Sequence, residues 1–204
     1  MNAEKPRRRD LWALTVLCLL RIRPMHPYEM QRLIRDWHKD EFLDLKRGSL
    51  YHAIERLRKA GLIDPIETSR EGRRPERTVY QLTEAGERHV CEWLKQLLAV
   101  PMREPTQFFA ALSFLPHLTP EIVQAQLEER TALLKSEIAS LKMVLETMVP
   151  KIGRLVLVEV EYAQAMREAE LAWVKSLLED LRTGKLTWDP AIVCRYAAQA
   201  PPTN

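Results

Sequence analysis

The chain has 204 residues, of which 46% are hydrophobic and 29% are charged, proportions that are typical of soluble globular proteins. The longest apolar run, Leu11 to Leu20, is shorter than the ~18 residues that a membrane-spanning helix needs, so we expect no membrane segment. Residues 1–90 carry 19 basic against 14 acidic side chains, and residues 91–204 carry 12 against 14. The basic half favours a nucleic-acid-binding module at the N-terminus.

The first sixty residues contain the patterns of three helices. The first is expected at about 10–21, where an apolar run follows an N-capping aspartate. The second is expected at about 27–38, because Pro27 suits a first helical turn. The third, 49–60, has apolar residues at spacings of four and three and ends at Gly61. Gly48, Gly61 and Gly86 are interpreted as turn and cap residues.

Two strands and a fourth helix are predicted next. Residues 62–67 are a short strand candidate, and the β-branched and aromatic side chains of residues 77–82 favour a returning strand. The two segments flank a polar, basic loop. We interpret 68–77 as the exposed part of a wing. Thr83 is expected to cap a helix at 84–99. Three helices followed by two strands and a basic loop give the element order of a winged helix-turn-helix, whose third helix enters the major groove of DNA.

The second half of the chain has the residue pattern of helices and contains almost no glycine. Two long amphipathic helices are predicted, about 120–148 and 152–182, and the first carries a heptad-like seam from Leu127 to Met148. This seam fits either contact between the two helices of one chain or a coiled-coil dimer. The predicted fold class is therefore mainly α, with a winged helix-turn-helix domain at 1–99 and a helical dimerisation domain at 100–204.

Candidate DNA-binding side chains cluster in and around the third helix and the wing. Arginine suits bidentate contact with guanine, and hydroxyl and basic groups suit phosphates. The alternatives are a packed ring for Tyr51 and a merely solvated side chain for His52. The candidate set is Lys46, Arg47, Ser49, Tyr51, His52, Arg56, Arg70, Arg73, Arg74 and Arg77.

Four motifs in the first half resemble the PadR family of bacterial transcriptional regulators. They are Met25-His26-Pro27-Tyr28-Glu29-Met30, Arg47-Gly48-Ser49-Leu50-Tyr51, Leu57-Arg58-Lys59-Ala60-Gly61-Leu62-Ile63 and Val79-Tyr80-Gln81-Leu82-Thr83-Glu84-Ala85-Gly86. One departure is Pro27, where the family usually has glycine, and proline still suits a first helical position. The second half is similar to the C-terminal domain of the subfamily described as virulence-activator-like.

The resemblance implies a homodimer held by the C-terminal helices. The dimerisation candidates are Leu127, Leu134, Ile138, Leu141, Leu145, Tyr162, Met166 and Trp173. It also implies a cytoplasmic repressor that binds an inverted-repeat operator in double-stranded DNA and is released by a small aromatic effector. Trp93 and Trp173 are the effector-binding candidates, because tryptophan stacks on flat ligands, and the alternative is that both simply pack in hydrophobic cores.

Other classes of function find less support in the sequence. Three cysteines without metal-ligand spacing indicate a reducing compartment and no metal site, and no cofactor is expected. We find no phosphate-binding glycine loop and no nucleophile motif, so an enzyme is not predicted. The remaining alternatives are a winged-helix adaptor that binds a protein and a small-molecule sensor that does not contact DNA.

Overall fold

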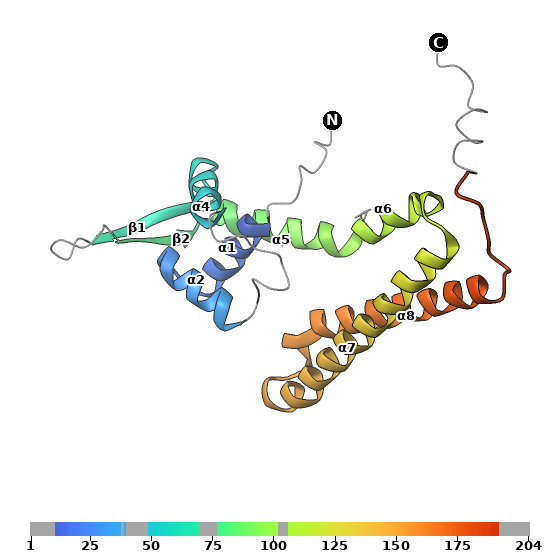
Figure 1. Cartoon of the computed structure of the whole chain (residues 1–204). Coiled ribbons are helices and arrows are strands. Elements are labelled where there is room, and N and C mark those ends of the chain that lie inside the picture. Colours follow the sequence, from blue (N-terminus) through green and yellow to red (C-terminus); the bar gives the residue numbers. More distant parts are fainter. Residues whose placement is uncertain (1–10, 38, 40–48, 70–76, 102–105, 192–204) are drawn as a thin grey trace, which may run out of the picture. The chain divides into compact units, whose positions relative to one another are not determined.

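The computed structural model describes residues 11–37, 39, 49–69, 77–101 and 106–191. The chain divides into two compact units, Met1–Arg103 and Glu104–Asn204, whose elements are labelled in Figure 1. Each unit has its own hydrophobic core. No helix in the described ranges combines the length and apolar character needed to cross a membrane.

The Met1–Arg103 unit packs helices around a small sheet. Helix α1 is buried almost all round, because most of its twelve residues are apolar, and α4 and α5 both pack against it. Met25, Met30 and Leu50 are fully buried in this core. Its elements are α1 (Leu11–Ile22), α2 (Pro27–Asp36), α4 (Ser49–Lys59), β1 (Ile63–Ser69), β2 (Arg77–Leu82) and α5 (Glu84–Ala99).

Strands β1 and β2 form an antiparallel hairpin, the wing predicted from the sequence. Ile63 pairs with Leu82 at its base, and the register shifts between Pro65 and Glu67, a bulge of the kind that increases local twist. On its other side β2 makes a two-bond bridge to the linker between α1 and α2, with Met25 N to Tyr80 O at 3.1 Å and Tyr80 N to Met25 O at 3.2 Å. The bridge attaches the wing to the helical core.

The end of α4 and the start of α5 meet at the base of this hairpin. Gly61 has φ +68°, which glycine adopts without steric cost at a helix C-terminus. The hydroxyl of Thr83 accepts from the amide of Gly86 at 3.0 Å and donates to the carbonyl of Gly61 at 2.9 Å. The interpretation of Gly86 as a turn or cap residue is wrong: it lies inside α5, and a Cβ there would come within 2.1 Å of the carbonyl oxygen of Leu62.

The Glu104–Asn204 unit is a helical hairpin with a short helical cover. Its elements are α6 (Gln107–Ser113), η1 (Leu115–His117), α7 (Pro120–Ile152), η2 (Arg154–Leu157) and α8 (Val158–Arg182). Helices α7 and α8 lie side by side (Figure 1). Their core consists of Val123, Leu127, Leu134, Val174 and Leu178.

The turn between the long helices differs from the prediction. We expected the first helix to end near residue 148, before Pro150, but α7 continues through Pro150 to Ile152 and ends at Gly153, with φ +86°. A proline inside a helix removes one backbone hydrogen bond, and its ring clashes with the carbonyl group of the preceding turn. Here it falls in the last turn of α7, so the helix continues for only two residues beyond it. The next helix accordingly starts at Val158 and not at 152.

Candidate nucleic-acid interface

Helix α4 has one buried face and one open face. Leu50, Ala53, Ile54 and Leu57 are buried, and the helix packs against α1. On the opposite side Tyr51 is 56% exposed, His52 and Arg56 are exposed, and Ser49 is half-buried at the first position of the helix. The structure therefore places these four predicted residues on one helix whose apolar side is held by the core, and it leaves Tyr51, His52 and Arg56 accessible.

An ion-pair cluster occupies the same helix towards its C-terminus. Arg58 donates to both carboxylate oxygens of Glu55, with Nε to Oε2 at 3.1 Å and Nη2 to Oε1 at 2.9 Å, and Lys59 Nζ lies 3.4 Å from Oε1. The hydrogen bond from Arg58 lowers the pKa of Glu55 below its usual value. Two cations share one anion, so this end of α4 keeps a net positive charge, which also suits the negative end of the helix dipole.

The motif Met25–Met30 turns out to position α2. The Nδ1 atom of His26 accepts from the amide of Tyr28 at 3.0 Å and caps the helix. Arg23 Nη1 lies 3.1 Å from Glu29 Oε2, and a second bond joins Nη2 to Oε1. These contacts lower the pKa of Glu29. The motif therefore fixes the start of α2 and its link to β2.

Exposed arginines on α2 were missed by the sequence reasoning. Arg32 and Arg35 are both exposed, at a spacing of three that places them on one side of the helix. They add two cations to a unit that is already basic, which suits contact with phosphates. The signal that could have found them is the polar face of α2, opposite buried Met30 and Ile34.

Part of the predicted DNA-binding set lies outside the described residues. Arg77 is described only through its backbone, as the first residue of β2 that pairs with Ser69. The base of the wing is described, and it is joined to α4 by a hydrogen bond from Leu62 N to Leu57 O at 3.0 Å. The candidates outside the described ranges are Lys46, Arg47, Arg70, Arg73 and Arg74.

The predicted dimerisation residues fall into two groups. Leu127 and Leu134 are buried in the core between α7 and α8, so the intramolecular alternative accounts for both of them. Ile138, Leu141 and Leu145 are half-buried on α7. Tyr162, Met166 and Trp173 on α8 are 67%, 50% and 48% exposed. Only this last group presents large apolar surface, and its role in a dimer stays a prediction.

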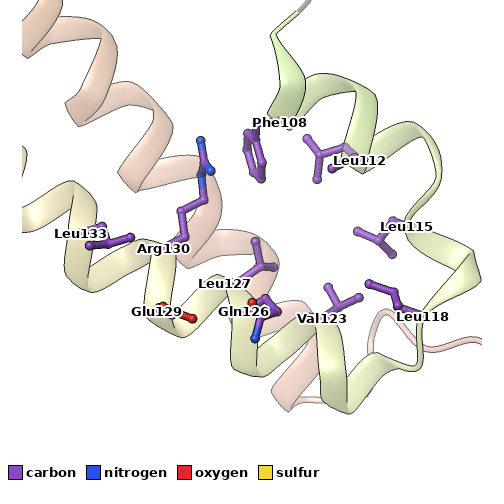
Figure 2. Close-up of a pocket in the computed structure, with 11 residues that line it drawn as sticks. Phe108, Leu112, Leu115, Leu118, Val123, Gln126, Leu127, Glu129, Arg130 and Leu133 are labelled. Carbon is purple, nitrogen blue, oxygen red and sulfur yellow. The ribbon is translucent and has the colours of Figure 1, made fainter.

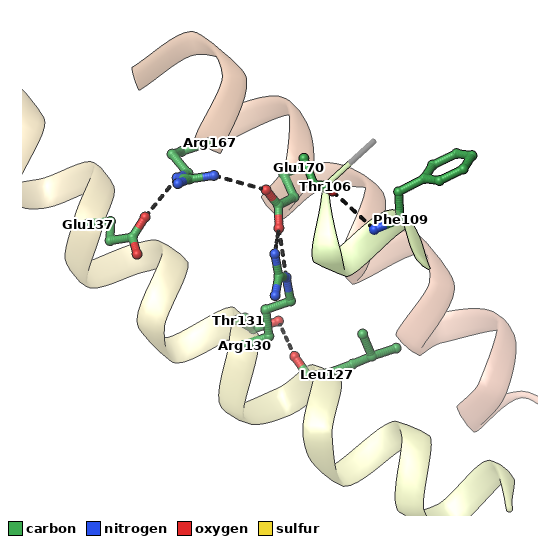
Figure 3. A network of polar contacts seen from close by, with 8 residues as sticks. All are labelled: Thr106, Phe109, Leu127, Arg130, Thr131, Glu137, Arg167 and Glu170. Atoms are coloured by element: carbon green, nitrogen blue, oxygen red, sulfur yellow. Dashed lines mark hydrogen bonds and ion pairs between the residues drawn. The ribbon is translucent and has the colours of Figure 1, made fainter. Parts of the chain in front are cut away.

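A polar network runs across the hairpin beside this core (Figure 3). Arg130 Nε donates to Glu170 Oε1 at 2.6 Å, Arg167 Nη1 lies 3.3 Å from Glu170 Oε2, and Arg167 Nε lies 2.7 Å from Glu137 Oε2. Each carboxylate has an arginine partner. The network therefore neutralises its own charges and holds α7 and α8 in register.

The two tryptophans proposed for an effector belong to different units. Trp93 packs against the core of Met1–Arg103, and the centroid of its ring lies 5.8 Å from the centroid of the His89 ring. The rings of Trp173 and Phe108 meet edge-on, with their centroids 6.2 Å apart. A cavity of about 460 Å³ lies between α6, η1 and α7 (Figure 2), and neither tryptophan lines it. In the described ranges no group of three or more His, Cys, Asp or Glu side chains could hold a metal ion.

Comparison with known proteins gives one family and several similar structures. Residues 16–92 match the model of the transcriptional regulator PadR-like family. No curated protein matches the chain significantly.

The similar structures share the fold at low identity. Bacillus subtilis PadR in complex with operator DNA is 20% identical with a TM-score of 0.64, and the match covers 84% of this chain and 99% of that one. The same protein in complex with p-coumaric acid is 16% identical with a TM-score of 0.69 and the same coverage. A PadR-like transcriptional regulator from Bacillus cereus is 17% identical, with a TM-score of 0.55 over 87% of this chain and 99% of that one.

The match covers α2, α4, the wing and most of α1 and α5. The matched residues therefore include α4 and the helices α1 and α5 of the same core. Through residues 16–92, this chain is therefore similar to the family of PadR-like transcriptional regulators.

Proposed function

We propose that the chain is a homodimeric repressor that acts in the cytoplasm and binds an inverted-repeat operator. Residues 1–99 would bind DNA and residues 100–204 would dimerise. The observation that carries the proposal is the open face of α4, where Tyr51, His52 and Arg56 project from a helix whose other face is buried. A rigid helix of this kind fits the major groove, and the basic wing supplies phosphate contacts.

DNA titrations at two salt concentrations test this proposal. We expect the protein to bind DNA from the region upstream of its own gene more tightly than an unrelated fragment, with an affinity that falls as salt rises. Arg56→Ala should relax specificity at one base pair, whereas Arg74→Ala should weaken binding to all sequences and reduce the salt slope by about one.

A matched control separates these effects from the loss of one positive charge. Arg88 is an exposed cation on α5, 3.8 Å from Glu84, and Arg88→Ala removes the same charge from the same unit. Its operator affinity should stay at the wild-type value. Unchanged affinity for Arg56→Ala and Arg74→Ala would refute the assigned face. An absence of DNA binding even at low salt would favour the protein-binding adaptor.

The exposed apolar stripe of α8 supports the dimer. Tyr162, Met166 and Trp173 are four and seven residues apart, so they lie on one side of the helix, and each is about half exposed or more. Two-fold pairing would double the contacts of one winged helix with DNA. Met166→Glu should therefore shift the molecular mass measured by light scattering towards the monomer. Ile66→Glu, at another exposed apolar residue on β1, is the control and should leave the mass unchanged.

The effector remains part of the proposal. Bacillus subtilis PadR is described in complex with p-coumaric acid, and this chain shares its fold. We propose that a small aromatic molecule releases this protein from its operator.

A further inference from the structure

The cavity between α6, η1 and α7 has the size and lining of a small-molecule site. Its volume of about 460 Å³ lies within the ~300–1,000 Å³ typical of ligand pockets. Figure 2 shows Phe108, Leu112 and Leu115 facing Val123 and Leu127 across it. These five side chains offer apolar and aromatic surface to an occupant.

Two hydrogen bonds hold the cavity walls in place. Thr106 caps α6 by accepting from the amide of Phe109 at 3.0 Å. The indole of Trp188 donates to the carbonyl of Leu118 at 2.8 Å, which fixes the end of η1 to the segment after α8. The cavity is thus formed before any ligand enters, which limits the ordering cost of binding.

The charge around the cavity distinguishes between ligand classes. Among the described residues that line the cavity, the one cation is Arg130, whose guanidinium carbon lies 3.6 Å from the centroid of the Phe108 ring. Arg130 also pairs with Glu170, so its charge is already compensated. Glu129 and Gln126 also line the cavity and are exposed at its rim. Within the described residues no cation pairs with Glu129. The rim therefore carries an uncompensated negative charge.

We propose that this α6–α7 cavity binds a flat aromatic molecule that bears a single amine. The ring system would lie against the leucines and Phe108, and the ammonium group would face the carboxylate of Glu129. This proposal names the chemical class of the effector in the proposed function. It rests on the proposed function only for the release of the protein from its operator. The binding step itself requires no operator.

Calorimetry with three naphthalenes of similar size tests the proposal on the full chain. The probes are 2-naphthylmethylamine, the neutral 2-naphthylmethanol and the anionic 2-naphthoate. We expect the amine to bind more tightly than the alcohol by about 2- to 5-fold, the range of a single exposed charge pair, and the carboxylate to bind most weakly. Glu129→Gln should remove the preference for the amine while the alcohol binds as before.

Two neighbouring alanines on α6 provide a matched pair of variants. Ala111 lines the cavity and Ala110 does not, and both are exposed. Ala111→Trp should fill the cavity and weaken the amine at least about 10-fold, as expected when an apolar pocket is lost, whereas Ala110→Trp should bind it like wild type.

Several results would overturn the proposal. They are no binding of any probe to the wild-type chain, a preference for the carboxylate, or wild-type binding by Ala111→Trp. Loss of the dimer in Ala111→Trp together with no probe binding to wild type would assign the cavity to a second copy of the chain. Failure of the operator titration would refute the proposed function alone, because the calorimetry contains no DNA.

Discussion

Replacing Gly86 by alanine is expected to destabilise the Met1–Arg103 unit, although alanine is the better helix former. In an unobstructed helix the change would stabilise by about 1 kcal/mol. Here the added Cβ would lie 2.1 Å from the carbonyl oxygen of Leu62 and 2.7 Å from Cδ1 of Leu82. Overpacking of a core typically costs ~1–3 kcal/mol. Because the nearest atom is backbone and cannot rotate away, we expect the upper end of that range and a net loss of about 2 kcal/mol.

Urea unfolding followed by circular dichroism measures this loss. Ala85 is the exposed neighbour of Gly86 on α5, so Ala85→Gly reports the helix-propensity effect without a clash and should cost up to about 1 kcal/mol. Gly86→Ala should also lower operator affinity, since it displaces the joint between α4 and the wing. A Gly86→Ala protein that is as stable as wild type or more stable would refute the close approach of α5 to Leu62.

Three further predictions concern the hairpin unit and the start of α2. Leu127→Ala should lower the free energy of unfolding by about 2–5 kcal/mol, because Leu127 is buried within one chain; a loss seen only at protein concentrations that permit a dimer would contradict this. Trp188→Phe should cost about 0.5–1.5 kcal/mol in the same urea assay, as it removes the hydrogen bond to Leu118. Arg23 lowers the pKa of Glu29 from 4.5, so this pair stabilises the fold above pH 4.5 and loses its contribution as the pH falls through the lowered pKa. Thermal unfolding of Glu29→Gln should show a smaller acid-induced drop in Tm than wild type, and an equal drop would count against the pair.

Local signals in the sequence predicted the winged domain closely. The helix predicted at 84–99 and the strand predicted at 77–82 have those bounds in the structure, and the helix predicted at 49–60 spans Ser49–Lys59. The two helices have a capping residue at one end: Thr83 is the N-cap of α5, and Gly61 with its positive φ follows α4. Caps and glycines act within a few residues of themselves, so they can be read without knowledge of the fold.

Features that depend on distant residues escaped the sequence reasoning. Helix α6 has only seven residues, too few to establish a hydrophobic period. The need for glycine at position 86 arises from Leu62, far away in the chain. The α6–α7 cavity likewise exists only because α6 and η1 fold back on α7. Tertiary packing decides all three.

The heptad seam shows why a repeat alone does not identify its partner. Leu127 and Leu134 have the spacing of a coiled coil, and α8 of the same chain covers them. A seam that is already buried offers no surface to a second chain. The proposed dimer would therefore use other residues, and among the predicted dimerisation residues Tyr162, Met166 and Trp173 on α8 expose the most apolar surface. Because burial of apolar area drives association, Met166→Glu tests the dimer more directly than any change at Leu127 or Leu134.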